Sequence, residues 1–590
     1  MTNNQVAGVD EADFIKNDSE FVYAALNDTL RIIDAWPAAE AHEVANVKLP
    51  GMAKKLFVTS DRALVYVSIP RQPLNATQGS QTPALVYASK SECTYGYDCQ
   101  FGGDGTATAL LVFDIADRSA PSLVRRLDLS GSLLAARRIG DAVHTVVVTP
   151  ELMFPGLSYS VPYPSGCGQQ LAGADLEQAY EALRERNAKI ITETPLTNLV
   201  PSVREQGNDY SDVNCGSVYR ETDPSGAAFT SLVSVDMVHD GAPVVSTVVS
   251  KPGAVYASDR ALYMAVIHDG ANTITPQQTT ARDLASVIHK FRIGNKAEVS
   301  AYLASGRVKG HVLNQFSLDE HAGHLRVATT WGKVPNPDVH STLSVLVQHD
   351  RNLDLVGKVD DIAPSEDIRS VRFDGERAFI VTFKKTDPLY VFDLAVPAAP
   401  RIVGELKIPG FSTYMHMLDA THLLTIGYDA ADQGNFAYFT GVLLQIFDVS
   451  DPSDPKLAHK TVIGTRGSSS EALTNHLAFN LFDGKLAVPM TVCEGGNTQG
   501  GYGTNMTFSG LIVYDVSIEQ GLVERGRVAH PGTTGMYNNA ACRNWWTNAN
   551  SVVERSIFMD DFVYSVARDV MRVQNLDALG SDVASVRLAP

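Results

Sequence analysis

Short apolar strands separated by turn residues recur along the whole chain. The clearest copy is residues 373–393, FDGERAFIVTFKKTDPLYVFD. In this stretch an apolar strand reaches a turn at Asp374–Gly375, an alternating strand follows, and a third strand ends in aspartate. The turn and the second strand recur at nine markers, which are Asp18, Asp61, Asp141, Asp259, Gly323, Asp374, Asp419, Asp483 and Asp560. The pattern therefore indicates a repeated antiparallel unit rather than one local hairpin.

The spacing of these markers is typical of the four-stranded blade of a β-propeller. The shortest intervals, Asp18 to Asp61 and Asp374 to Asp419, are 43 and 45 residues, and a propeller blade takes roughly 40–45 residues. Fourth strands follow Pro-containing turns, as in PAAPRIVGELKIPG, and very little helix is visible, which excludes a βαβ architecture. We predict an all-β fold in which residues 1–590 form a single large propeller, with nine blades by count and eight as the alternative.

Three intervals are much longer than the period, and each holds two of the six cysteines. They are Cys93 and Cys99 in the 80-residue interval, Cys167 and Cys215 in the 118-residue interval, and Cys493 and Cys542 in the 77-residue interval. We place the insertions at 71–107, 150–227, 491–508 and 531–552. Six cysteines allow fifteen pairings, and pairing within each insertion is the local choice, because each bridge would then tie down a loop. Free thiols, a zinc site or a redox centre are the alternative, which the absence of Cys-x-x-Cys disfavours.

The longest insertion also carries the one convincing helix, DLEQAYEALRERNAKII, at about 175–191. Asp175 can act as its N-cap, with Gln178 reaching back as in a capping box. Its apolar stripe consists of Leu176, Ala179, Tyr180, Leu183 and Ile190. We expect this helix to lie over a rim of the propeller.

Charge and cysteine content bear on partners and compartment. The net charge of −18 opposes binding to nucleic acid, whose phosphates require Lys and Arg. No run of eighteen apolar residues appears, so no transmembrane segment is expected. The N-terminus has no basic start followed by an apolar core, so no signal peptide is visible. Because disulfides persist outside the cytosol, we nevertheless expect the mature part of an extracytoplasmic protein, either secreted, periplasmic or surface-tethered.

Several segments resemble a family of predicted secreted bacterial and archaeal proteins with a β-propeller distantly related to WD40 repeats. The matching segments are TNNQVAGVDEADFIKND, NQFSLDEHAGHLRVATTWG, SVRFDGERAFIVTFKKTDPLYVFDLAVPAAPRIVGELKIPGFSTYMHML, NHLAFNLFDGKLAVP and ERSIFMDDFVYSV. The chain departs from the family pattern at Asn475, where Asp is expected before His476, and at Met417, where Pro is expected after His416. The resemblance implies a secreted or membrane-tethered propeller, and it implies no reaction.

The acidic opening GVDEAD is the first candidate site. Asp10, Glu11 and Asp13 are carboxylates of the kind that Ca²⁺ prefers. Their spacing is not that of an EF-hand loop, and a structural role that closes the first blade against the last is the competing interpretation.

The sequence MHM, Met415 to Met417, offers ligands suited to copper. Alternate residues of a strand face opposite ways, so His416 would point away from both methionines, and core packing is the better interpretation. His476 is expected on or near an inner strand, where it could face the central channel as a hydrogen-bonded structural residue.

No nucleophile elbow, His-Glu-x-x-His motif or phosphate-binding loop is present. We therefore expect a non-catalytic module that binds a protein or a surface polymer through its insertions, because loops on a rigid scaffold carry function. Trp545 and Trp546 are candidate surface-binding residues, with the covering of a blade edge as the alternative. The competing hypothesis is a metal-assisted hydrolase or lactonase with its site at the mouth of the channel. Oxygen and imidazole ligands meeting near the axis would favour the enzyme, and an arginine-paired channel would favour binding.

Overall fold

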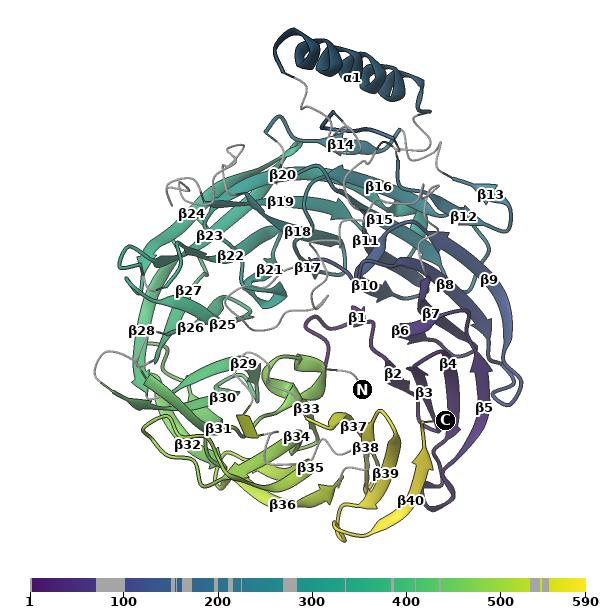
Figure 1. The fold of residues 1–590 in the computed structure, drawn as a ribbon. Helices are drawn as coiled ribbons and strands as arrows, with labels where there is room; N and C mark the ends of the chain where they lie inside the picture. Colours follow the sequence, from purple (N-terminus) through teal and green to yellow (C-terminus); the bar gives the residue numbers. More distant parts are fainter. Residues whose placement is uncertain are drawn as a thin grey trace.

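Nine four-stranded antiparallel blades surround a central axis in the part of the chain that the structure describes (Figure 1). This computed structural model describes residues 3–69, 101–149, 154, 156–161, 172–195, 200–210, 216–223, 225–268, 284–334, 336–383, 387–408, 410–433, 437–530, 542–543 and 551–589. The predicted all-β propeller is confirmed, and nine is the number of blades. Two of them share one sheet, because their outer strands meet in a single parallel pair, Ser305 with Asn352.

The blades follow one another in chain order, each from its inner to its outer strand. The first is β2 (Ile15–Asn17), β3 (Phe21–Leu26), β4 (Thr29–Asp34) and β5 (His42–Lys48). The second is β6 (Met52–Val58), β7 (Arg62–Ile69), β8 (Ala107–Asp114) and β9 (Ser122–Leu129). The third is β10 (Ser132–Ile139), β11 (Ala142–Thr149), β15 (Phe229–Asp236) and β16 (Val244–Val249). The fourth is β17 (Ala254–Ala257), β18 (Ala261–His268), β19 (Ala285–Arg292) and β20 (Ala301–Lys309).

The remaining five blades keep the same order. The fifth is β21 (Leu318–His321), β22 (His324–Trp331), β23 (His340–His349) and β24 (Asn352–Ile362). The sixth is β25 (Asp367–Asp374), β26 (Arg377–Phe383), β27 (Asp387–Asp393) and β28 (Arg401–Ile408). The seventh is β29 (Phe411–Met417), β30 (His422–Asp432), β31 (Ala437–Asp448) and β32 (Lys456–Ile463). The eighth is β33 (Asn480–Phe482), β34 (Lys485–Glu494), β35 (Asn505–Ser517) and β36 (Gly521–Ala529). The ninth is β37 (Val553–Met559), β38 (Phe562–Ala567), β39 (Val570–Asn575) and β40 (Asp582–Arg587).

Burial explains why the middle strands are apolar throughout and the outer ones are mixed. In β26, residues 378–383 are all buried, because a middle strand is covered on both faces by the neighbouring blades. The outer strand β28 alternates with exposed positions, as expected for a strand at the rim. The apolar middle strands of consecutive blades therefore form the core between blades.

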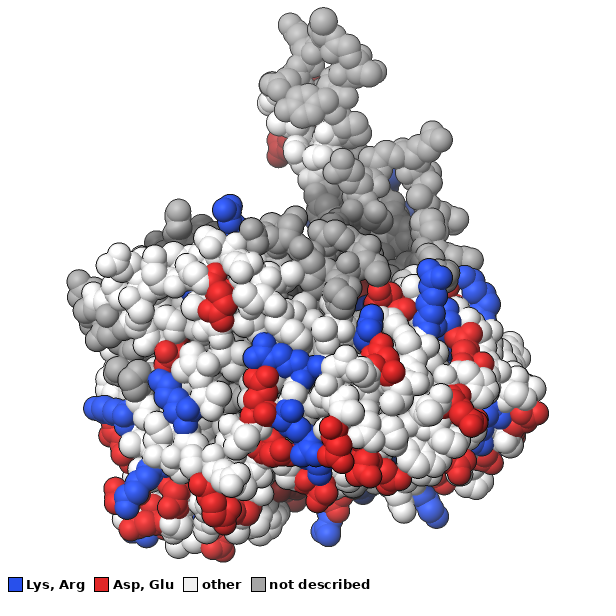
Figure 2. All heavy atoms as spheres, turned by 90° about the horizontal axis from the view of Figure 1, so that it is seen from below, with Lys and Arg blue, Asp and Glu red and all other residues white. Residues whose placement is uncertain are grey.

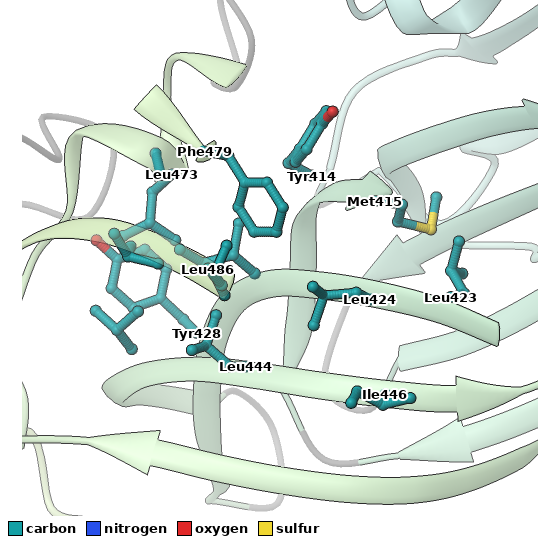
Figure 3. Close-up of a cluster of buried hydrophobic side chains, with 14 of the residues drawn as sticks. Tyr414, Met415, Leu423, Leu424, Tyr428, Leu444, Ile446, Leu473, Phe479 and Leu486 are labelled. Atoms are coloured by element: carbon teal, nitrogen blue, oxygen red, sulfur yellow. The ribbon is translucent and has the colours of Figure 1, made fainter. Parts of the chain in front are cut away.

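Figure 3 shows one such core, between the seventh and eighth blades. Leu424 on β30, Leu444 on β31 and Leu486 on β34 pack together with Tyr414 and Phe479. Burying a large apolar side chain contributes about 1.5–3 kcal/mol. Blade-to-blade contacts of this kind hold the ring together.

The ring is closed by packing of the last blade against the first, without exchange of a strand. The hydroxyl of Tyr564 on β38 donates to the carbonyl of Ala35, at 2.5 Å. The ring of Phe562 meets that of Trp36 edge-on, with centroids 5.9 Å apart. Buried residues of both blades belong to one hydrophobic cluster, so side-chain packing and the hydrogen bond to the Ala35 carbonyl join the two ends of the propeller.

The described part of the 150–227 insertion contains a helix and three short strands. The hairpin β12 (Val203–Glu205) and β13 (Asn208–Asp209) extends the outer edge of the second blade through β9, and β14 (Val218–Arg220) adds to the third blade through β16. The helix α1 (Gly173–Glu193) lies outside the ring of blades, beyond β14 (Figure 1). The added strands cover sheet edges that would otherwise expose unpaired backbone groups.

The start of α1 corrects one detail of the sequence analysis. The N-cap is Ala172, and no side chain caps the helix, so the capping box of Asp175 and Gln178 is wrong. Asp175 lies in the first turn instead, where its charge still favours the helix dipole. None of the helical residues is buried.

The other predicted insertions can be compared with the observed ends of the strands. β34 and β35 extend into the expected insertion 491–508, so that only 495–504 connects them. The 71–107 and 531–552 regions separate β7 from β8 and β36 from β37. Five 3₁₀ helices are also described, η1 (Ala38–Glu40), η4 (Ala297–Val299), η5 (Gln315–Ser317), η6 (Glu471–Leu473) and η7 (His476–Ala478).

Candidate binding face and the central channel

The N-terminal segment, residues 3–14, runs into the centre of the ring, where Figure 1 marks the N-terminus. The Asn3 side-chain amide donates to the Tyr414 hydroxyl at 3.0 Å. The same amide also donates to the carbonyls of His476 and Phe479, both at 2.9 Å. It thereby satisfies polar groups of the seventh blade and of the loop that leads into the eighth blade.

Two further contacts fix this segment to blades on the other side of the axis. The Gln5 side-chain amide donates to the carbonyls of Gln315 and Leu318, at 3.1 and 3.2 Å. The strand β1 (Asp10–Glu11) pairs with β10 of the third blade. The N-terminal segment thus joins blades that are separated by hundreds of residues in the chain.

Glu11 is the most completely buried carboxylate of the segment, with a side chain only 3% exposed. The Arg137 guanidinium and Nε2 of His476 lie 3.4 and 3.3 Å from its Oε2. The Gln315 side-chain amide and the Gln5 backbone amide donate to it at 3.1 and 2.9 Å. Burial would raise the pKa of Glu11, but the charges of Arg137 and His476 and the hydrogen bonds from His476 and Gln5 outweigh it, so this pKa lies well below its usual value.

Asp13 makes a buried two-pronged ion pair with the last blade. Nε of Arg555 lies 2.7 Å from Oδ2 of Asp13 and Nη2 lies 2.9 Å from Oδ1, with both side chains nearly inaccessible to solvent. The Asp13 backbone also forms a bridge with Leu56 of the second blade. This carboxylate therefore links the chain before the first blade to the ninth, in the closing role that competed with metal binding.

Asp10 faces yet another pair of cations. Its Oδ1 accepts from Nζ of Lys16 at 2.6 Å, and its Oδ2 lies 3.1 Å from the Arg138 guanidinium. Asp10, Glu11 and Asp13 therefore do not converge, and each carboxylate is neutralised by its own Lys, Arg or His partners. An oxygen-only cage of the kind that holds Ca²⁺ is not assembled by these three residues.

Met415 and Met417 of the MHM sequence both pack against the same hydrophobic core. Met415 is buried in the core shown in Figure 3, whereas His416 lies beside Phe479, with ring centroids 6.0 Å apart. Burial, with a further contribution from the charge of Arg372, lowers the pKa of His416 to about 4. This imidazole is consequently neutral at physiological pH, and its Nδ1 lies 3.3 Å from the Tyr414 hydroxyl.

His476 is buried in η7 at the centre of the ring. Its imidazole meets Phe316 edge-on, with centroids 4.9 Å apart, and faces Glu11 as described above. The residue lies in a 3₁₀ helix that directly precedes the inner strand β33, and it packs around the N-terminal segment.

Cys493 and Cys542 form a disulfide bond across 49 residues, the pairing expected within the last insertion. It connects the end of β34 to the chain between the eighth and ninth blades. The other predicted site residues, Cys93, Cys99, Cys167, Cys215, Trp545 and Trp546, lie outside the described residues.

The propeller has two faces of different construction, which follow from its antiparallel strands. In each blade, the turns from the first to the second strand and from the third to the fourth strand emerge on one face, which we call the turn face. All of these turns are short, and the longest spans residues 293–300. Connections from the second to the third strand and between blades emerge on the opposite face, which we call the insertion face. Every long connection is of this second kind. These connections are 70–106, 150–228, 269–284, 464–479, 495–504 and 530–552.

Aspartates at the ends of third strands stabilise the turn face. Asp114, Asp393 and Asp448 each accept a hydrogen bond from the backbone amide two residues later, at 2.9–3.0 Å. Such Asx turns fix a tight reversal of the chain. The recurrent aspartate therefore has a structural role rather than a catalytic one.

The insertion face of the seventh to ninth blades is held by the disulfide and by close backbone packing. A Cβ at Gly467, which has φ +101°, would lie 2.1 Å from the carbonyl oxygen of Cys542. The Arg466 guanidinium lies over two aromatic rings, 5.1 Å from the centroid of Tyr438 and 4.5 Å from that of Tyr502. Cation–π contacts of this kind hold the glycine-rich connection 495–504 in place.

Charge is mixed on the surface that Figure 2 presents. Lys and Arg side chains are interspersed with Asp and Glu there, although the chain carries a net charge of −18. No single-sign field therefore dominates this view of the molecule.

A family model described as a beta propeller domain matches residues 1–579. An uncharacterised protein of Archaeoglobus fulgidus is 43% identical over 196 residues, which cover 33% of this chain and 28% of that protein. An uncharacterised protein of Methanocaldococcus jannaschii is 42% identical over 156 residues, which cover 26% of this chain and 24% of that protein. The matched region thus spans about a quarter of the length of these curated relatives.

Two solved structures align with this chain at low similarity. Sqt1 of Saccharomyces cerevisiae aligns over 62% of this chain and 84% of its own, with 10% identity and a TM-score of 0.34. A hypothetical selenium-binding protein of Sulfolobus tokodaii aligns over 75% of this chain and 90% of its own, with 8% identity and a TM-score of 0.29.

Proposed function

Because this chain belongs to the beta propeller domain family, we propose that it is a non-catalytic module that binds a protein or a surface polymer through its insertion face. The observation that carries the proposal is the distribution of connections. Every long connection between described strands emerges on one face, and short Asx-stabilised turns close the other. Elaborated loops on a rigid scaffold are where binding proteins place their contacts.

The central channel supports binding rather than catalysis. Asp10, Glu11 and Asp13 each lie beside an arginine, respectively Arg138, Arg137 and Arg555, so each carboxylate is directed to its own partner on a blade. A carboxylate paired with an arginine in this way serves the fold. This is the arginine-paired arrangement that the sequence analysis associated with a binding module.

An extracytoplasmic location is part of the proposal. The disulfide between Cys493 and Cys542 supports it, because such bonds persist in oxidising compartments. Among the described residues, no helix combines the length and the apolar character that crossing a bilayer requires.

Lysine labelling tests which face binds. The protein would be mixed with a cell-envelope fraction of its source organism, and amine labelling would be compared between free and bound protein. Lys48 and Lys456 form a matched pair, because both are well exposed, at 72% and 66%, and both pair with an aspartate of a neighbouring turn. Lys48 ends β5 at the insertion face, whereas Lys456 begins β32 at the turn face.

We expect the bound protein to lose labelling at insertion-face lysines, among them Lys48, Lys309 and Lys333. Turn-face lysines, among them Lys296, Lys456 and Lys485, should keep theirs. Protection confined to the turn face, or equal on both faces, would overturn the proposal.

A further inference from the structure

A second group of polar side chains lies on the insertion face of the fifth blade. His340 begins β23 at this face, and Asp360 and Asp361 lie near the end of β24. Nε2 of His340 is 3.8 Å from Oδ1 of Asp360 and 3.6 Å from Oδ1 of Asp361. Among the described residues, this is the one group of three His, Cys, Asp or Glu side chains whose ligand atoms all lie within 4.8 Å of one another.

A β-bulge brings the two carboxylates to the same side of the strand. Consecutive residues of a regular strand point to opposite faces. The pairing of β23 with β24 shifts between Ser341 and Leu343, so that one residue of β23 lies opposite two of β24. Asp361 takes the left-handed conformation, with φ 57°, as in bulges that redirect a side chain. Both carboxylates can therefore face the same imidazole.

The surroundings of His340 fix its tautomer and its orientation. Nδ1 lies 2.8 Å from the carbonyl oxygen of Asp338, and because a carbonyl can only accept, Nδ1 carries the hydrogen. The ring is stacked on Trp331, with centroids 5.0 Å apart and planes at 29°. Nε2 is buried and has no hydrogen-bond partner in the described structure. In the neutral ring its lone pair therefore points at two carboxylates.

A lone pair facing two anions is unfavourable, and either a proton on Nε2 or a metal ion between the three groups removes that repulsion. Histidine that binds a metal commonly donates its other ring N–H to a backbone carbonyl, which is what His340 does. We propose that His340, Asp360 and Asp361 form a binding site for a divalent transition-metal ion such as Zn²⁺. Three N and O ligands with water in a fourth position suit that ion, whereas Ca²⁺ takes oxygen ligands only.

Two lysines set the affinity of this site. Nζ of Lys309 lies 3.1 and 3.3 Å from the two carboxylate oxygens of Asp360, and Nζ of Lys358 lies 3.1 Å from Oδ2. Their side chains are 39% and 53% exposed, so both ammonium groups can move into solvent when a metal ion binds. Their positive charge competes with the ion, and removing one of them should strengthen binding.

Calorimetric titration of the tag-free protein with Zn²⁺ tests the site directly. His340→Ala and Asp361→Asn each remove one ligand, and the second change lies on a side chain that is 78% exposed and leaves the core intact. His349→Ala is the matched control, because His349 lies at the other end of β23 beside Asp350, with its Nδ1 4.0 Å from that carboxylate. Lys358→Gln removes a competing charge.

We expect one Zn²⁺ per chain at this site, with affinity at least tenfold weaker in the His340→Ala and Asp361→Asn proteins. His349→Ala should match the unchanged protein, Lys358→Gln should bind severalfold more tightly, and Ca²⁺ should give no signal. Absence of stoichiometric Zn²⁺ binding, or binding that survives both ligand changes, would overturn the proposal. Unchanged affinity in Lys358→Gln would contradict the involvement of Asp360.

Discussion

Replacing Asp13 by Asn should destabilise the protein strongly, because it removes one partner of a buried ion pair. The carboxylate and the Arg555 guanidinium are 5% and 6% exposed and share two short contacts, at 2.7 and 2.9 Å. Removing one member of such a pair costs about 3–5 kcal/mol, because a buried charge is left without compensation. Arg555 also donates to the Glu554 carbonyl, so we expect a loss near the lower end, about 3 kcal/mol.

The partner change is Arg555→Met, and Arg568→Met is its matched control. Arg568 and Arg555 lie over the same Phe14 ring, 4.9 and 5.1 Å from its centroid. Arg568 is 56% exposed and pairs with Glu554, and a surface pair contributes about 0–1 kcal/mol. Comparing the stability losses of Arg555→Met and Arg568→Met therefore separates the effect of the buried ion pair from the effect of contact with the Phe14 ring.

The assay is urea unfolding of the unchanged protein, Asp13→Asn, Arg555→Met, the double variant of these two changes, and the control Arg568→Met. The double variant should be less destabilised than the sum of the two single changes, since residues in direct contact couple by about 0.5–3 kcal/mol. A loss below about 1 kcal/mol for Asp13→Asn, or strict additivity, would refute the account of how the N-terminal segment closes the ring.

Three other substitutions test separate parts of the structure. Glu11→Gln should lower the stability of the protein at neutral pH and make its stability depend less on acid pH. The pKa of Glu11 in the folded protein lies below its usual value of 4.5, so the carboxylate stabilises the fold above pH 4.5, and this contribution is lost as the pH falls through the folded pKa. Melting curves recorded from pH 3 to 7 would show the difference. Cys542→Ser should cost about 2–4 kcal/mol in urea unfolding, because the bond to Cys493 closes a loop of 49 residues; an unchanged midpoint would contradict this. Gly427→Ala should reduce the free energy of unfolding by about 2 kcal/mol or more, because a Cβ at this position would lie 1.8 Å from a carbonyl oxygen of the neighbouring strand. Gly241→Ala is the control, because no atom lies within 4 Å of a Cβ built there, and this variant should melt within about a degree or two of the unchanged protein.

Local turn chemistry is the reason that the fold could be predicted from the sequence. The Asp–Gly turns need left-handed backbone, and the structure shows φ 53° at Gly375 and φ 47° and 67° at Asp483 and Gly484. The aspartates that end the third strands cap turns with their own side chains. Both signals lie within a few residues, so they repeat visibly with each blade.

The contacts along the axis could not be predicted in this way, because they join residues that are far apart in the chain. Asp13 and Arg555 are 542 residues apart, and neither residue carries a local mark of its partner. The acidic cluster looks like one candidate ligand set in the sequence, yet Asp10 and Glu11 are consecutive strand residues, whose side chains point to opposite faces. A usable signal is present in the arginines that interrupt apolar first strands, such as Arg137 in SLLAARRI and Arg555 in VERSIFM. A buried arginine in such a strand requires an anionic partner.

The candidate metal-binding group also could not be predicted from the sequence, because its geometry depends on contacts between strands. His340, Asp360 and Asp361 lie on two neighbouring strands, and only the bulge in β24 turns both carboxylates toward the imidazole. The sequence GKVDDIAPS contains the acidic pair, but regular strand alternation assigns its two carboxylates to opposite faces. The position of the bulge is a property of the folded sheet.

Hydrogen exchange of the N-terminal segment tests the central claim most directly, namely that this segment is fixed to several blades inside the ring. Peptides from residues 3–17 should exchange as slowly as those from β10, the inner strand with which β1 pairs. The helix α1, which has no buried residue, is the internal reference for rapid exchange. An N-terminal segment that exchanges as rapidly as α1 would show that it is not fixed to the blades and would contradict the account.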